Sequence, residues 1–226
     1  NSFKMDSNES TGRILGLDVS TKTIGMALFE GDGKLLELTH ITPKIKPRPE
    51  TKLEELFKKV DAFEKVLTRY IELDIEKVVI EEPLLNSNNV YTVGTLLKFN
   101  GMISKMVSEV LNIVPDFISS YDARAYSFPE LMQVRTHNKK GEPYNDKQLA
   151  KNKPVLFGGY DWNVDKKTVI WDKVANLEPQ IVWEYTRNNT LKKENFDMTD
   201  AYACARAIMC KEGKWNCTEK VKAEVV

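Results

Sequence analysis

The chain has little histidine and cysteine, and this scarcity excludes several kinds of metal site. Only His40 and His137 occur in 226 residues, so a histidine-rich metal centre is excluded. The three cysteines, Cys204, Cys210 and Cys217, are odd in number and widely spaced. That pattern argues against both a disulfide framework and a zinc site, and we therefore expect a reducing compartment, the cytoplasm.

Long apolar runs and net charge are also absent. No apolar stretch approaches the length of a membrane span, and no secretory signal stands at the N-terminus, so we expect no membrane partner. The 33 basic residues balance 33 acidic ones, giving a formal net charge of zero. This balance weakens any nucleic-acid hypothesis based on bulk charge. The 42% of apolar residues is enough for a sizeable core.

The chain is expected to form one domain between two polar ends. Residues 1–11 are predicted to be a disordered arm or an addition to the native chain, residues 12–212 a single domain, and residues 213–226 a tail. From about 131 to 165 the periodic pattern gives way to a stretch rich in Lys, Asn, Gly and Pro. This stretch is longer than an ordinary connection, which indicates a functional loop or an inserted subelement. It is basic between Arg135 and Lys153, although a solvated loop explains such a run equally well.

Hydrophobic periodicity and turn residues predict an α/β chain. Strands are expected at 13–19, 24–30, 35–41, 76–81 and 116–120, with a hairpin turn at 31–34. Helices are expected at 51–73, 91–112, 166–175 and 199–211. Three hairpin strands followed by alternating helix and strand predict a mixed sheet with helices on its faces.

Four carboxylates stand at the edges of these apolar segments. Asp18 closes the first predicted strand, Glu81 closes the fourth, and Asp197 and Asp200 lie near the start of the last helix. An acid at the edge of a core element is costly to desolvate unless a partner compensates it, and a divalent cation is the usual partner. Three such elements meeting at one place would make an all-oxygen site suited to magnesium and phosphodiester chemistry.

The order of these segments resembles the RNase H-like fold, and within it the RuvC-type Holliday-junction resolvases, including phage, poxviral and mitochondrial relatives. Residues 15–27 match the family's first strand, turn and second strand; 78–83 match the acid that ends its fourth strand; 197–201 match its closing Asp-x-x-Asp-Ala. The resemblance covers roughly 13–130 and 166–210. It implies a five-stranded mixed sheet, with three antiparallel hairpin strands and then parallel strands, flanked by helices.

The resemblance implies a magnesium-dependent, structure-selective endonuclease that nicks branched DNA and resolves four-way junctions as a homodimer. Two Mg²⁺ ions per site, with Mn²⁺ able to substitute, would activate a water and stabilise the leaving 3′ oxygen. No small-molecule cofactor is implied. Asp18 would bridge the cations, Glu81 and Asp200 would each hold one side, and Asp197 would complete the set. The insertion and the charge balance suggest a phage or viral branch, acting in the host cytoplasm in DNA recombination and repair.

The resemblance also suggests residues that contact DNA. Lys166 or Lys167 stands where the family places lysines that approach the scissile phosphate, and we add Lys167 to the catalytic set. The candidate DNA-binding residues are Ser20, Lys22, Asn86, Asn89 and Lys166, together with Lys139 and Lys140 of the basic stretch, which the resemblance does not cover. Bacterial members stack an aromatic on bases after the fourth strand, where this chain has Pro83-Leu84-Leu85. Other aromatics could stack, although each is more often a core residue: Tyr91, Phe99, Phe157, Tyr160 and Trp162.

Each acid also has a structural explanation. Asp18 could belong only to a turn after a strand, and Glu81 or its neighbour Glu82 could be a surface acid. We choose Glu81 because it stands at the motif position, and successive residues of a strand point to opposite faces. Asp197 and Asp200 also fit a helix cap and an acid in the first helical turn, where the helix dipole favours negative charge.

Three other functions remain open. The same fold could cut RNA in RNA–DNA hybrids, which would require recognition of 2′-hydroxyl groups. An actin-like or sugar-kinase ATPase has a similar first phosphate motif, but it needs a second copy of the fold and therefore a longer chain. A binding module that has lost catalysis is disfavoured by the intact acids.

Overall fold

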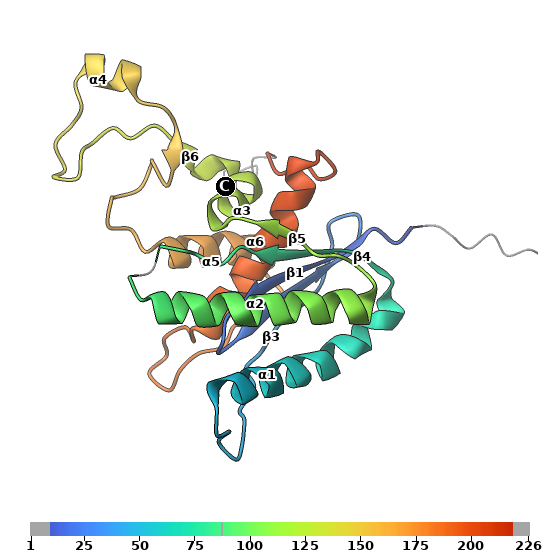
Figure 1. Ribbon diagram of the computed structural model, residues 1–226. Helices are drawn as coiled ribbons and strands as arrows, with labels where there is room; N and C mark the ends of the chain where they lie inside the picture. The colour runs from blue at the N-terminus through green and yellow to red at the C-terminus, as the bar shows by residue number, and fades with distance from the viewer. Residues whose placement is uncertain (1–9, 87, 219–226) are drawn as a thin grey trace, which may run out of the picture.

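The computed structural model describes residues 10–86 and 88–218. The outer parts of the predicted arm and tail, residues 1–9 and 219–226, lie outside these ranges. The centre is a five-stranded sheet in the order β3-β2-β1-β4-β5 (Figure 1). Its strands are β1 (Arg13–Val19), β2 (Ile24–Phe29), β3 (Leu35–Ile41), β4 (Ile75–Glu81) and β5 (Asp116–Ile118).

Strands β1 to β3 are antiparallel neighbours, whereas β4 runs parallel to β1 and β5 parallel to β4. The predicted α/β class is therefore confirmed, and the sheet has the mixed, five-stranded arrangement of the RNase H-like fold. The helices are α1 (Lys52–Leu67), α2 (Val90–Leu111), α3 (Ser120–Ser127), α4 (Asp146–Lys151), α5 (Lys166–Leu177) and α6 (Glu194–Lys211), with 3-10 turns at Thr68–Leu73 and Pro129–Leu131.

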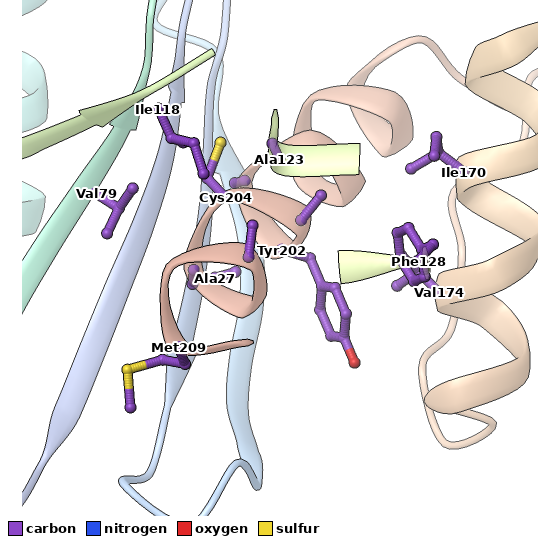
Figure 2. Packing of buried hydrophobic residues seen from close by; sticks show 14 of the residues in the cluster. Ala27, Val79, Ile118, Ala123, Phe128, Ile170, Val174, Tyr202, Cys204 and Met209 are labelled. Carbon is purple, nitrogen blue, oxygen red and sulfur yellow. The ribbon is translucent and has the colours of Figure 1, made fainter. Parts of the chain in front are cut away.

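Two hydrophobic clusters cover the two faces of the sheet. Successive strand residues alternate between them: Val78 and Ile80 pack with α1 and α2, whereas Val79 packs with α6, α3 and α5. Figure 2 shows the cluster that contains Val79, with Ala27 and Val79 on the sheet side of α6 and Val174 on the far side. Both faces of the central strands are thus buried, which explains their nearly continuous apolar sequence.

Helix α6 lies unusually close to the sheet because two glycines leave room for it. A Cβ atom on Gly16 of β1 would stand 2.2 Å from the carbonyl oxygen of Ala201, and one on Gly25 of β2 would stand 2.1 Å from that of Asp197. Real Cβ atoms do not approach backbone atoms so closely. These two strand positions therefore fix the height of α6 above the sheet.

Several helix boundaries differ from the sequence prediction. The last helix begins at Glu194 rather than 199, and Lys193 before it makes no side-chain capping bond. Asp197 is therefore an acid of the first turn and not the cap, so the capping alternative was wrong. Helix α3 was missed because its first residue was assigned to the preceding strand. Ser119 caps this helix by accepting a hydrogen bond from the backbone N–H of Asp122 at 3.0 Å.

The insertion after β5 and α3 is folded. Its short strands β6 (Met132–Gln133) and β7 (Val155–Leu156) pair antiparallel. Helix α4 between them starts with a capping box, in which Asn145 and Gln148 satisfy each other's backbone N–H groups. In Figure 1 this yellow segment projects away from the sheet and its covering helices. It therefore presents a surface separate from the central sheet.

The prediction about the cysteines was wrong. Cys210 and Cys217 form a disulfide, with Cα atoms 5.8 Å apart. The chain turns back after α6 at Gly213, whose φ of 70° is left-handed, and this turn brings together two cysteines that are seven residues apart. The cysteines therefore no longer support a reducing compartment. Within the described ranges, no helix is both long and apolar enough to cross a bilayer.

Candidate active site

Three carboxylates from different elements meet at one edge of the sheet. Asp18 lies near the end of β1, Glu81 ends β4, and Asp200 lies on α6; one carboxylate oxygen of each is within 4.8 Å of the others. Leu17 is the register partner of Ile80 in the parallel pair of β1 and β4, so the next residues, Asp18 and Glu81, emerge side by side. The predicted meeting of acids thus follows from strand direction.

Gly25 brings the third element to this edge. It is the register partner of Asp18 in the antiparallel pair of β1 and β2. Its missing side chain lets the backbone of Asp197 lie directly on β2. Asp200, one turn later on α6, then reaches Asp18. Asp197 lies outside the 4.8 Å group, but it lines the same cavity of about 310 Å³, which we call the acid pocket.

Burial and mutual repulsion dominate the electrostatics of the acid pocket. Desolvation raises the pKa of Asp18 well above its ordinary value, and the charges of Glu81 and Asp200 add to this effect. Desolvation and the charge of Glu81 raise the pKa of Asp200 to about 7, while Arg124 and Lys167 oppose the rise. The pKa of Asp197 is also raised by desolvation, against the influence of Lys167. The acids are therefore poorly compensated by the side chains around them.

This donor set fits a hard divalent cation. All three clustered ligands are carboxylates from half-buried residues, and Mg²⁺ and Mn²⁺ prefer oxygen ligands. A dication among them would remove the repulsion that raises their pKa values. The residues present are thus compatible with the metal that the sequence resemblance implies.

Two cationic side chains border the acids. Lys167 at the start of α5 lines the acid pocket, as does Arg124 of α3, which sequence reasoning missed. The Nε of Arg124 is buried and has no hydrogen-bond partner among the described residues, and its guanidinium lies 5.8 Å from the ring centre of Phe157. No sequence signal distinguished Arg124 because the helix that carries it was itself not predicted.

A second cavity, of about 710 Å³, adjoins the acid pocket. It shares Ser20, Lys167 and Asp197 with that pocket and adds Lys22 and Lys193. We call it the lysine pocket. Lys59 also lines it, but its ammonium group donates to the carbonyl of Thr21 and pairs with Glu55 at 3.3 Å. Lys193, which the sequence did not suggest, is exposed at the start of α6.

The other predicted DNA-binding residues lie elsewhere. Asn86 is exposed, and Asn89 caps α2 by accepting a hydrogen bond from the backbone N–H of Thr92 at 3.2 Å. Lys166 is exposed, with its ammonium group 5.9 Å from the ring centre of Phe157. Lys139 and Lys140 line a separate cleft in the insertion. The structure therefore spreads the predicted set over the lysine pocket, the segment before α2, the start of α5 and the insertion.

Burial separates the remaining candidates, namely the second acid after β4 and the aromatic residues considered for stacking on bases. Glu82 is exposed at the rim of the acid pocket, outside the three-carboxylate group. Phe99 and Phe157 are core residues, each 1% exposed, whereas Tyr91 is 71% exposed. Of the aromatics considered for stacking, the accessible ones are Tyr91, Tyr160 and Trp162.

Neither a family model nor a curated protein matches the sequence. Among solved structures, the chain is similar to Thermus thermophilus RuvC, with a TM-score of 0.48 and 15% identity over 89% of this chain and 97% of that one. The similarity to RuvC from the same organism in complex with a Holliday junction substrate has a TM-score of 0.48 and 14% identity, over 88% of this chain and 94% of that one. The similarity to the yeast mitochondrial Holliday junction resolvase has a TM-score of 0.48 and 13% identity, over 92% of this chain and 82% of that one. Identities this low are uninformative about activity.

Proposed function

We propose that the protein is a metal-dependent endonuclease that nicks branched DNA and resolves four-way junctions. The observation that carries this proposal is the acid pocket, where carboxylates from β1, β4 and α6 place oxygens within 4.8 Å of one another. A structural ion pair would put a cation among them. Here the nearest cations, Arg124 and Lys167, leave the pKa of Asp200 at about 7. Such uncompensated acids are typical of a site that takes its counter-charge from a ligand.

The proposal assigns the metal to Asp18, Glu81 and Asp200, with Asp197 beside them. Bound there, two Mg²⁺ ions, or Mn²⁺ in their place, would supply an activated water and charge stabilisation at the leaving 3′ oxygen. The chain's own contribution is to hold these oxygens rigidly. Two of the carboxylates project from strands of the central sheet, and the third projects from a helix seated on it. This preorganisation lowers the cost of assembling the charged site.

Arg124 and Lys167 are proposed to hold the scissile phosphate. Arg124 has a buried Nε–H that meets no partner within residues 10–86 and 88–218, and a phosphate oxygen entering the acid pocket would provide one. Lys167 lines both the acid pocket and the lysine pocket, so it can contact a phosphate at their junction. Ser20, Lys22 and Lys193 then suit the next phosphate of the same strand. Cationic contacts of this kind fix the register of the backbone.

Branched DNA as the substrate and a homodimer as the active form come from the resemblance of the sequence motifs. Resolution of a four-way junction needs two symmetric nicks, which a two-fold dimer supplies. Apolar side chains that a partner could cover are exposed before and along α2: Leu84, Leu85, Val90, Tyr91 and Leu97. On the resemblance alone, since the cysteines no longer support it, we also propose action in the cytoplasm, and in the host cytoplasm for a phage-encoded protein.

The test is cleavage of a synthetic four-way junction with Mg²⁺, beside a linear duplex and an RNA–DNA hybrid. We expect the junction to be nicked preferentially and Asp18→Asn to lose about 10³-fold in rate, equivalent to ~4 kcal/mol. Asp61→Asn, at an exposed position of α1, is the matched control and should cut normally.

An intact junction with the wild-type protein, or an Asp18→Asn variant that cuts as well as Asp61→Asn, would refute the proposal. Preferential cleavage of the hybrid would instead identify an RNase H-type enzyme.

A further inference from the structure

The insertion contains a cleft of about 500 Å³ that the acid pocket does not use. We call it the insertion cleft. One wall is the turn from Arg135 to Gly141, and the other is the segment from Gly158 to Asn163. Its volume lies in the range typical of sites for small ligands or single nucleotide units, and is too small for a protein domain.

Defined hydrogen bonds hold the two walls in place. The indole N–H of Trp162 donates to the carbonyl of His137 at 3.0 Å, and the Arg135 guanidinium donates to the carbonyl of Tyr160 at 3.0 Å. The side chain of Asn138 closes the turn by accepting from the backbone N–H of Lys140 and Glu142 at 2.9 and 3.0 Å. The cleft is therefore a built feature of the insertion.

Its lining combines positive charge with aromatic surface. Arg135, Lys139 and Lys140 line it against a single carboxylate, that of Asp161. Across the part of the chain that the structure describes, none of the three cations forms an ion pair within 4.0 Å. An anionic ligand would meet this unpaired charge, and a phosphodiester backbone is the anion that the proposed substrate offers.

Aromatic groups stand at the same place. Trp162 is 36% exposed and Tyr160 is 37% exposed. The Arg135 guanidinium covers Trp162 at 3.7 Å from its ring centre, and the Lys139 ammonium lies 5.5 Å away. Phosphate-binding cations beside partly exposed rings are typical of sites for single-stranded nucleic acid, because unpaired bases can lie against the rings. A duplex keeps its bases stacked and would offer the cleft its backbone alone.

The insertion cleft is also close to the acid pocket along the chain. Trp162 precedes Lys167 by five residues, which span at most about 18 Å. The two positions are therefore no farther apart than about five nucleotides along one strand of B-DNA. The base of the insertion reaches the acid pocket as well, because the ring of Phe157 packs against Arg124. One DNA strand could therefore occupy both places.

We propose that the insertion cleft binds single-stranded DNA, the unpaired strand that flanks a branch. Lys139 and Lys140 contact its phosphates, and the edge formed by Tyr160 and Trp162 receives a base. The identity of the nucleic acid rests on the proposed nuclease function. The cleft itself, however, can be measured without metal and without cleavage.

The test is binding of a fluorescent single-stranded oligonucleotide by the full chain in EDTA, followed by anisotropy. The double variant Lys139→Gln/Lys140→Gln should bind about tenfold more weakly. The matched control is Lys151→Gln/Lys153→Gln, which removes the same charge from exposed positions of the insertion outside the cleft lining, and it should bind within twofold of wild type. Trp162→Leu should also weaken binding by at least fivefold. Limited proteolysis within residues 133–163, compared with that of wild type, shows whether the insertion remains folded.

Equal losses in the two double variants would mean that bulk charge alone attracts DNA, and would overturn the inference. Competition by an unlabelled duplex as effective as that by the unlabelled single strand would also overturn it. A failure of junction cleavage with the expected binding pattern would reject the nuclease and leave the cleft standing. Normal junction cleavage by the wild-type protein, with unchanged oligonucleotide binding in the Lys139→Gln/Lys140→Gln variant, would support the nuclease and reject the insertion cleft as a DNA-binding site.

Discussion

The acid pocket and the insertion cleft are opposite in charge and in burial. In the acid pocket, half-buried carboxylates from three elements of the central fold repel one another. In the insertion cleft, the exposed Lys139 and Lys140 and the half-buried Arg135, all from a single excursion of the chain, stand beside aromatic rings. The repelling carboxylates of the acid pocket raise the free energy of the metal-free folded protein. The lysines of the insertion cleft change this free energy little, because water solvates them.

This contrast separates two tasks. Buried, preorganised charge is suited to chemistry, because its interactions are strong where water is excluded. Exposed cations are suited to affinity, which salt screens and which many positions can share. We therefore expect changes in the acid pocket to affect cleavage and metal binding, and changes in the insertion cleft to affect DNA binding. Three experiments test that separation, in order of decreasing effect.

The strongest test is Gly25→Ala, which alters the acid pocket without touching a carboxylate. The new Cβ would stand 2.1 Å from the carbonyl oxygen of Asp197, so α6 must shift and carry Asp200 away from Asp18. Overpacking of this kind costs about 1–3 kcal/mol of stability. We expect the rate of junction cleavage to fall at least ~100-fold, because a displaced ligand disrupts the whole constellation. Urea unfolding and cleavage assays measure the two effects.

The matched control is Asp61→Ala, at an exposed position of α1 outside the linings of the acid pocket and the lysine pocket. Alanine favours helix over aspartate by up to ~0.7 kcal/mol, so this variant should be equally or more stable and should cut normally. Single-stranded DNA binding in EDTA should be unchanged in both variants. A Gly25→Ala protein that cuts normally would mean that α6 does not need its close approach to β2.

The acid pocket could be predicted from sequence because its parts are periodic elements. Asp18 and Glu81 stand at the ends of buried strands, and parallel strand ends meet at one edge regardless of what surrounds them. The contribution of Gly25 was not predicted, since a glycine in a strand shows its purpose only when the helix above it is known. Arg124 was missed together with α3. The insertion cleft has no periodic signal at all: it depends on turns and on bonds between residues such as His137 and Trp162, 25 positions apart.

A second test uses pH and metal to follow the acid pocket alone. The pKa of Asp200, raised from 3.8 to about 7, means that the metal-free folded state holds a proton that the unfolded state has released. Stability contributed by this group is therefore fully present below pH 3.8 and is lost as the pH rises through about 7. Metal binding needs the deprotonated carboxylate, so Mn²⁺ affinity should fall about tenfold for each pH unit below 7. Calorimetric titration with Mn²⁺ at pH 5.5, 6.5 and 7.5 measures this dependence.

The control for this test is Asp200→Asn, which cannot release the proton. Its metal-free melting temperature should decline less than that of wild type between pH 4 and pH 7, and its Mn²⁺ affinity should be low at every pH. A wild-type Mn²⁺ affinity that is constant from pH 5.5 to pH 7.5 would show that the carboxylates are already ionised without metal. The acid pocket would then lack the uncompensated charge that distinguishes it from the insertion cleft.

The smallest effect is expected for Lys193→Gln. This variant tests whether the lysine pocket positions the DNA strand for cleavage in the acid pocket or only adds to the affinity for DNA. Lys193 lines the lysine pocket with Lys167 and Asp197, whereas its neighbour Lys192 is exposed outside that lining and provides a matched control. Loss of one phosphate contact should weaken junction binding roughly fivefold, equivalent to ~1 kcal/mol. It should also reduce the slope of log affinity against log salt concentration by about 0.9.

Lys192→Gln should change neither quantity appreciably, and equal effects in the two variants would mean that the strand does not enter the lysine pocket. If Lys193→Gln also slows cleavage at saturating DNA, this lysine positions the strand at the acid pocket, a task that the exposed lysines of the insertion cleft are not expected to share.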